Sequence, residues 1–251
     1  MHGKDKLKSG FMFKEKIKEI REFCELNSDP KIIAKYSKYF KQGFDGFGID
    51  DKVYNGQIES WIEEWEGEMT LQNYLDLSDE LIKNGKFEEK ALAIHFVKSK
   101  KAEYTEETFD RIGKWFELGI SNWAATDILC MLVLPHFFIE HIIGFDKLKE
   151  WNSAQSEWQR RAVPVLLVEL SKSKKDLKYD EAISVIEPLM DDRSEYVQKG
   201  LGTLLRELWK KQPKETEKFL YEWKEKCGRL IIRYATEKMD KEYRKKFRKA
   251  K

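Results

Sequence analysis

One short segment combines residue types that could do chemistry. The sequence "NWAATDILCMLV", starting at Asn122, places Trp123 and Asp127 four positions apart at the start of a predicted helix. Residues at this spacing share one helix face. Asp127 stands among apolar residues, and burial of an unpaired carboxylate is costly or raises its pKa. Two explanations stay open: a hydrogen bond or salt bridge to another helix, or a ligand that develops positive charge beside the carboxylate.

Other patterns with chemical content are weak. The three cysteines, Cys24, Cys130 and Cys227, match no metal-ligand spacing, and His136 and His141 stand five apart, a poor fit to one helix face. The sequence shows no nucleophile–base triad, so we expect neither a metal nor a cofactor. An odd number of widely separated cysteines favours a reducing, cytoplasmic location.

The composition describes the elements that must position these residues. Charged residues make up 37% of the 251-residue chain, Pro occurs only 5 times, and 47 basic against 45 acidic residues leave a net charge of +2. This is typical of a helical protein with solvated outer faces, and the net charge neither requires nor excludes nucleic acid. The longest apolar run, "ILCMLVLPHFFI", is too short to span a membrane, and we expect no membrane association.

A weak repeat organises the predicted helices. Four helix starts, at Lys86, Asn122, Glu157 and Glu195, align so that one aromatic residue recurs at intervals of 36, 35 and 38 residues. These aromatics are Phe87, Trp123, Trp158 and Tyr196. Second helices are predicted over residues 105–118, 178–189 and 213–226, with a poorly defined one over 137–150. A period of this length with two helices per unit indicates an all-α solenoid of HEAT-like repeats.

Two columns of the repeat bear on function. Four positions after each aromatic stand Ala91, Asp127, Ala162 and Gly200. Three of these residues are small, as expected where helices approach closely, and Asp127 is the exception. The preceding column reads Lys90, Thr126, Arg161 and Lys199. Since equivalent positions of a solenoid line up, this column predicts a basic stripe suited to a phosphate backbone, extended by Thr203 and Arg206.

Taken together, these segments resemble a known family. "YFKQGFDGFGI" from Tyr39, "ALAIHFVKSKKAEYTEETFDRIGKWFELGISNWAATD" from Ala91, "EWQRRAVPVLLVEL" from Glu157 and "VQKGLGTLLRELWKKQP" from Val197 are similar to the AlkD-type DNA alkylation repair proteins. The resemblance runs from about Tyr39 to Arg233. It implies HEAT-like repeats wound into a superhelix with a basic concave groove, and release of N3- and N7-alkylated purines from duplex DNA without a tight base-flipping pocket, metal or cofactor.

The resemblance also implies roles for individual residues. The family's Trp and Asp pair in the groove falls on Trp123 and Asp127, which become the expected catalytic residues. Its groove arginines fall on Arg161, with Arg160 beside it, and on Arg206. With Lys199 and Thr203, these are the expected DNA-binding residues. Two positions depart from the family pattern: Thr203 replaces a second groove Trp, which removes sugar-stacking surface, and Ala124 replaces an acidic residue.

The sequence thus predicts a single repeat domain over residues 1–251, with flexible or basic termini at 1–10 and 241–251. The leading hypothesis is a monomeric, cytoplasmic, nucleoid-associated alkylpurine DNA glycosylase. One alternative is a non-catalytic relative that binds DNA structure, and the other is a protein-interaction scaffold, a common use of α-solenoids.

Overall fold

The computed structural model describes residues 2–173 and 177–248, with side chains from Phe13 onward, and these residues form helices and loops without a strand. The chain divides into two compact units. Unit 1 comprises Met1–Glu103 and Leu118–Ile120, and unit 2 comprises Tyr104–Glu117 and Ser121–Lys251. Among the described residues, no helix is both long and apolar enough to cross a membrane.

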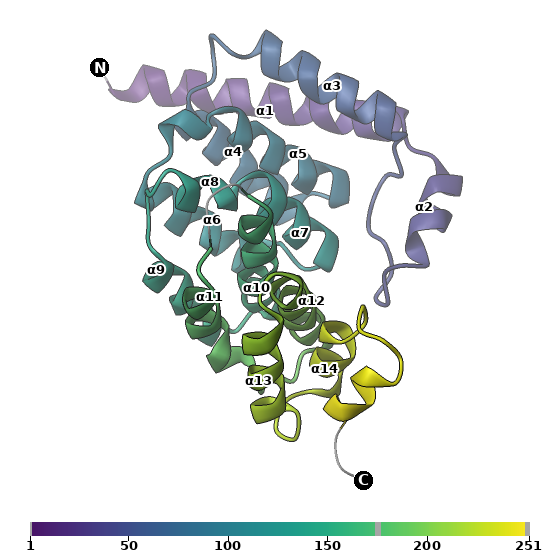
Figure 1. Ribbon diagram of the computed structural model, residues 1–251. Coiled ribbons are helices and arrows are strands. Elements are labelled where there is room, and N and C mark those ends of the chain that lie inside the picture. The colour runs from purple at the N-terminus through teal and green to yellow at the C-terminus, as the bar shows by residue number, and fades with distance from the viewer. Residues whose placement is uncertain (1, 174–176, 249–251) are drawn as a thin grey trace. The chain divides into compact units, whose positions relative to one another are not determined.

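Unit 1 is built from five α-helices and a short 3-10 helix. They are α1 His2–Leu26, α2 Pro30–Ser37, α3 Asp51–Glu64, α4 Leu71–Asn84, α5 Phe87–Ser99 and η1 Lys101–Glu103. The α1 and α3 helices lie along each other, where Phe23 meets the buried Trp61 ring edge-on (Figure 1). The α5 helix packs on α4, and its Phe96 stacks on Tyr74.

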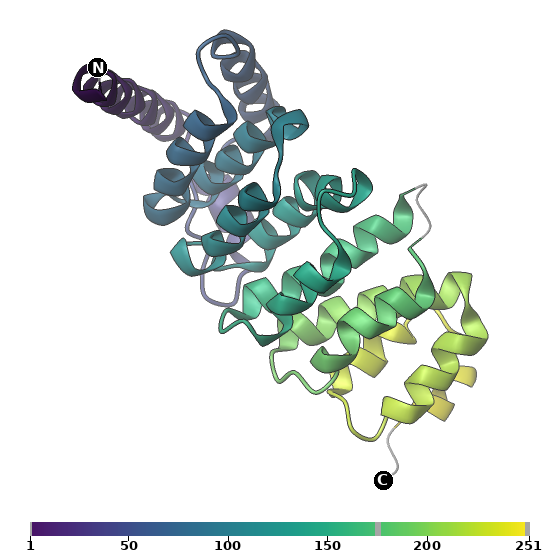
Figure 2. The ribbon, with the colours of Figure 1, turned by 90° about the vertical axis from the view of Figure 1, so that its left-hand side faces the viewer.

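Unit 2 contains the helices that carry the expected site. They are α6 Glu106–Leu118, α7 Trp123–Leu132, α8 Leu134–Ile139, α9 Phe145–Lys149, η2 Glu150–Ser153, α10 Glu157–Lys172, α11 Tyr179–Ile186, η3 Glu187–Leu189, α12 Glu195–Lys211, α13 Pro213–Trp223, α14 Arg229–Ala235 and η4 Tyr243–Phe247. Four of them, α7, α10, α12 and α14, pack each on the next in chain order, and Figure 2 shows them in succession from teal to yellow.

This succession confirms the predicted all-α repeat. The helices α5, α7, α10 and α12 each begin within one residue of the predicted start, and α6, α11 and α13 lie within the predicted second helices. The weakly patterned region 137–150 is divided between α8, α9 and a loop. A single repeat domain over 1–251 and a concave groove stay predictions. Both termini were expected to be flexible or basic. At the N-terminal end, α1 is helical from His2, and at the C-terminal end Phe247 of η4 is buried. Residues 1 and 249–251 lie outside the described residues.

The close approach of the stacked helices depends on small residues. A Cβ placed on Gly200 of α12 would lie 3.0 Å from Pro164 Cγ of α10. One placed on Gly202 would lie 2.5 Å from Tyr234 Cβ and 2.7 Å from the Ile231 carbonyl oxygen, both on α14. A methyl group at Gly202 would therefore overlap atoms of α14, whereas one at Gly200 would make a tight contact that Pro164 must shift slightly to admit.

Gly202→Ala is expected to lower the free energy of unfolding by roughly 1–3 kcal/mol, because the α12–α14 interface must open to admit the methyl group. Gly56→Ala is the matched control, since Gly56 lies inside α3 with open space around the new Cβ. It should raise stability by about 0.5–1 kcal/mol through helix propensity. Urea unfolding of both variants tests this, and a neutral Gly202→Ala would contradict the packing argument.

Candidate functional site

The start of α7 fixes which of its residues face solvent. The Asn122 side chain caps the helix by accepting a hydrogen bond from the Ala125 backbone N–H at 2.9 Å. The residues that α7 buries are Ala125, Thr126, Leu129 and Cys130. This buried stripe leaves Trp123 and Asp127 together on the opposite, half-exposed face.

The structure corrects the predicted basic stripe at Thr126 and shows a backbone contact for Lys90. Thr126 is fully buried, and its hydroxyl donates to the Asn122 carbonyl at 2.9 Å, so it lies in the core of unit 2 and not on a phosphate-binding surface. Lys90, in unit 1, is half-buried and donates to the Gly119 carbonyl at 2.9 Å. Burial lowers its pKa. The repeat alignment misplaced Thr126 because α7 buries Ala125 and Thr126, whereas α10 buries Ala162 and Val163.

Asp127 forms a two-point ion pair with Arg161 of α10. The Asp127 Oδ1 atom accepts from Arg161 Nε at 3.0 Å, and Oδ2 accepts from Nη2 at 2.8 Å. The remaining Nη1 group of Arg161 donates to the Tyr196 carbonyl of α12 at 2.8 Å. The Arg161 side chain is 11% exposed and that of Asp127 is 26% exposed. This geometry is the planar, bidentate arrangement that makes Arg–carboxylate pairs strong and directional.

The electrostatics of Asp127 reflect two opposing causes. Burial raises the pKa of the Asp127 carboxyl above its usual value, and the two hydrogen bonds and positive charge of Arg161 oppose that rise. The negative charge of Glu169 contributes a further, smaller increase of the pKa. Arg161 therefore stabilises the ionised form of Asp127 against the effect of burial.

The other expected DNA-binding cations are also engaged within unit 2. Arg160 Nε lies 2.6 Å from Asp192 Oδ2, and its Nη1 donates to the carbonyls of Ala154 at 2.7 Å and Gln155 at 2.9 Å. Arg160 thus binds the loop that precedes α10, and it shares no partner with Arg161.

On α12, Lys199 and Arg206 carry their own carboxylate partners. Lys199 Nζ lies 3.0 Å from Glu195 Oε2, and Arg206 Nη1 lies 2.7 Å from Glu237 Oε2. Thr203 is half-exposed and lies between them on the same face of α12 by helical spacing. The structure therefore assembles Trp123, Asp127 and Arg161 and leaves the α12 cations in separate ion pairs.

The sequence prediction missed the acidic partners of these cations. Glu195 precedes Lys199 by four residues, a spacing that identifies helical ion pairs from sequence. Asp192 and Glu237 lie 32 and 31 positions from the arginines they bind, so no local pattern indicates them. Met131 was missed as well: it is 57% exposed, four residues after Asp127, on the same face of α7.

Comparison with known proteins gives this fold and site a family. Residues 20–239 match the family described as DNA alkylation repair enzyme. The chain belongs to this family, whose membership supports a role in DNA repair.

Solved structures share the fold at low sequence identity. One is described as a predicted DNA alkylation repair enzyme from Enterococcus faecalis, with 18% identity, coverage of 86% of this chain and 98% of that one, and a TM-score of 0.70. Another is AlkD2 from Streptococcus mutans, with 19% identity, coverage of 84% and 98%, and a TM-score of 0.57. No curated protein matches the chain significantly.

A double-mutant cycle of Asp127→Asn and Arg161→Gln should show a coupling free energy of roughly 1–3 kcal/mol, because each single change strands a mostly buried polar partner. The exposed pair of Asp146 and Lys149, 2.9 Å apart, is the control, with an expected coupling below about 1 kcal/mol. Denaturant unfolding measures both cycles. Equal couplings would show that the site pair is no stronger than a surface pair.

Proposed function

We propose that this protein is a monofunctional DNA glycosylase that hydrolyses the N-glycosidic bond of N3- and N7-alkylated purines in duplex DNA. The observation that carries the proposal is the pairing of Trp123 and Asp127 on one half-exposed face of α7, with the carboxylate held at two points by Arg161. Membership of the DNA alkylation repair family supports the choice of substrate and favours it over a protein-interaction scaffold.

The chemistry requires little from the protein. An N3- or N7-alkylpurine carries positive charge and leaves readily, so the bond to C1′ breaks with the electron pair going to the base. The sugar then acquires oxocarbenium character, which a carboxylate stabilises electrostatically. Asp127 is assigned this role and that of orienting the water that attacks C1′. The Trp123 ring offers an aromatic face to the deoxyribose and the cationic base.

Arg161 is assigned a positioning role through the carboxylate. Its two hydrogen bonds orient both oxygens of Asp127, and its third contact fixes the guanidinium to the Tyr196 carbonyl of α12. Because the guanidinium is already engaged on two sides, its contribution to binding a phosphate is secondary to holding Asp127.

Base release should fall on acidification, because protonation of Asp127 removes the negative charge that stabilises the sugar cation. Burial raises the pKa of Asp127, so the loss is expected at a higher pH than for an exposed aspartate. In Arg161→Gln the opposing positive charge is gone, and the acidic limb should move to still higher pH. Single-turnover rates from about pH 4 to about pH 8 test both statements, because this range lies above the ordinary aspartate pKa of about 3.9. An acidic limb that does not move in Arg161→Gln would exclude Asp127 as its source.

The decisive measurement is release of 7-methylguanine and 3-methyladenine from methylated duplex DNA. Asp127→Asn should lower the rate by roughly 100-fold or more while DNA binding persists, and each tenfold loss corresponds to about 1.4 kcal/mol of transition-state stabilisation. Asp192→Asn is the matched control, since it breaks another Asp–Arg pair, with Arg160, that shares no residue with the Asp127–Arg161 pair. It should cost stability and leave release intact.

A second candidate function is favoured by two observations. Asp127 already has a helix-to-helix partner, which is a sufficient structural reason for a carboxylate at this position, and Thr203 offers no aromatic surface. Both suit a non-catalytic relative that binds DNA structure. Absence of release by the natural protein, together with tight binding to branched or bent DNA, would establish this second function in place of the first.

A further inference from the structure

Two groups of cations in unit 2 differ in their carboxylate contacts. Those predicted to bind DNA each lie within 4.0 Å of a carboxylate: Arg160, Arg161, Lys199 and Arg206. Among the described residues, four arginines near the C-terminal end form no ion pair within 4.0 Å: Arg229, Arg233, Arg244 and Arg248. Asp240 is the carboxylate nearest to this group in its effect, because backbone hydrogen bonds lower the pKa of Asp240 and the charge of Arg244 adds to that lowering. An uncompensated cation keeps its full attraction for an external anion, whereas a paired one must first give up its partner.

These four arginines line one cavity. It has a volume of about 720 Å³ and is formed by α14 and the segment around η4, with Ile232, Thr236 and Phe247 as its other lining residues. Ile232 and Phe247 are buried, and the Thr236 hydroxyl is turned to the Ile232 carbonyl at 2.8 Å. The floor of the cavity is therefore apolar or internally satisfied, and its charged groups are all guanidinium groups.

Several contacts hold η4 beside α13. Phe247 is fully buried and packs on Tyr221 of α13, with ring centroids 4.7 Å apart. Glu217 of α13 accepts hydrogen bonds from Tyr243 at 2.7 Å and from Trp209 at 2.9 Å. These contacts place Arg244 and Arg248 on a structured segment, so the cavity does not depend on a free basic tail.

The chemistry of the arginines also suits phosphate groups. Arg229 and Arg233 are four residues apart on α14, and Arg244 of η4 and Arg248 just after it line the second wall. Guanidinium groups present planar forks of donors that bind phosphate oxygens in a bidentate manner. The α14 wall follows α12 in the succession of helices, and Glu237, just beyond α14, binds Arg206 on the Thr203 face of α12.

We propose that this arginine cavity is a binding site for backbone phosphates of DNA, separate from Trp123 and Asp127, and that it supplies a major sequence-independent part of DNA affinity. The proposal rests on the DNA-binding part of the proposed function and is independent of catalysis. A site of this kind would bind the duplex through its backbone and position it, without contacting the base that is removed.

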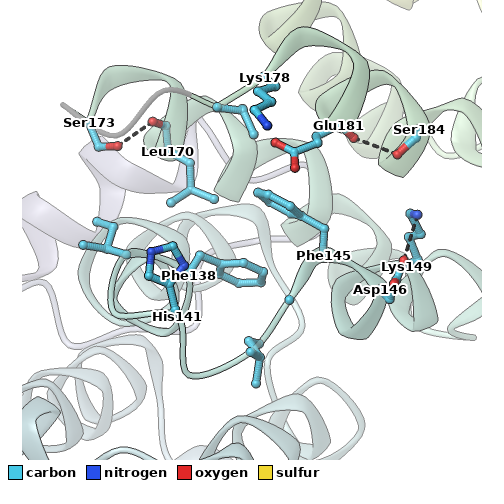
Figure 3. A pocket seen from close by; sticks show the side chains of 14 residues that line it. Phe138, His141, Phe145, Asp146, Lys149, Leu170, Ser173, Lys178, Glu181 and Ser184 are labelled. Carbon is cyan, nitrogen blue, oxygen red and sulfur yellow. Dashed lines mark hydrogen bonds and ion pairs between the residues drawn. The ribbon is translucent and has the colours of Figure 1, made fainter.

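A second cavity of unit 2 provides a contrast. It has a volume of about 540 Å³ and lies among α8, α9, α11 and the end of α10 (Figure 3). The rings of Phe138 and Phe145 stack inside it, and its charged lining has two carboxylates, Asp146 and Glu181, beside two lysines, Lys149 and Lys178. Carboxylates of this kind repel phosphates, so the arginine cavity is the one suited to a nucleic-acid backbone.

The test uses the full chain and an undamaged duplex, with affinity measured as a function of salt concentration. The variant Arg229→Gln with Arg233→Gln should weaken binding and make the slope of log K against log salt shallower by up to about 1.8, at roughly 0.9 per phosphate contact. Arg244→Gln with Arg248→Gln should act in the same direction. Thermal unfolding of each variant shows whether weaker binding reflects the loss of an arginine–phosphate contact or the loss of the folded structure.

The matched control is Lys214→Gln with Lys218→Gln, which removes two exposed charges four residues apart on α13. It should change the slope less than either arginine pair. Equal slopes for all variants would overturn the proposal. So would arginine variants that lose affinity for phosphatidylserine vesicles but keep their affinity for DNA. Since binding needs no base release, a protein that binds DNA through this cavity without releasing a base would disprove the glycosylase and leave the phosphate site standing.

Discussion

The Arg161 side chain is the contact around which the candidate site is organised. Its three nitrogens bind Asp127 of α7 and the Tyr196 carbonyl of α12, so one residue of α10 joins the two helices that pack on α10, α7 and α12. The arrangement requires close helix packing, which Gly200 permits by leaving room for Pro164. Packing and electrostatics are thus coupled: a wider spacing between α10 and α12 would leave a largely buried guanidinium without its carbonyl acceptor, a costly state.

This arrangement gives Asp127 two physical roles that need not conflict. As half of an ion pair it fastens α7 to α10, and as a half-exposed carboxylate it presents negative charge beside Trp123. Preorganised charge is what electrostatic catalysis requires, because a carboxylate that is already oriented needs no rearrangement when a cation develops. The family assignment supports a role of this chain in DNA repair.

Two surfaces of unit 2 differ in whether their positive side chains contact carboxylates. The predicted DNA-binding cations of α10 and α12 each contact a carboxylate, whereas the four arginines of the cavity have none within 4.0 Å among the described residues. A net charge of +2 conceals this difference, because the whole chain is nearly neutral while individual surfaces are not. In this view the balanced region positions chemical groups, and the unbalanced cavity supplies long-range attraction for a polyanion.

The sequence by itself determined the helical repeat, the starts of α7, α10 and α12, and the juxtaposition of Trp123 with Asp127, since these depend on local periodicity and capping. Only the tertiary structure decided that Thr126 is buried, that Arg161 binds Asp127 and that Arg160 binds Asp192. The partners in each of these ion pairs lie more than thirty positions apart, and the rotation of each helix about its axis follows from packing on its neighbours. Local patterns carry no record of such distant pairings, so the electrostatic state of the site could be known only after the helices were placed.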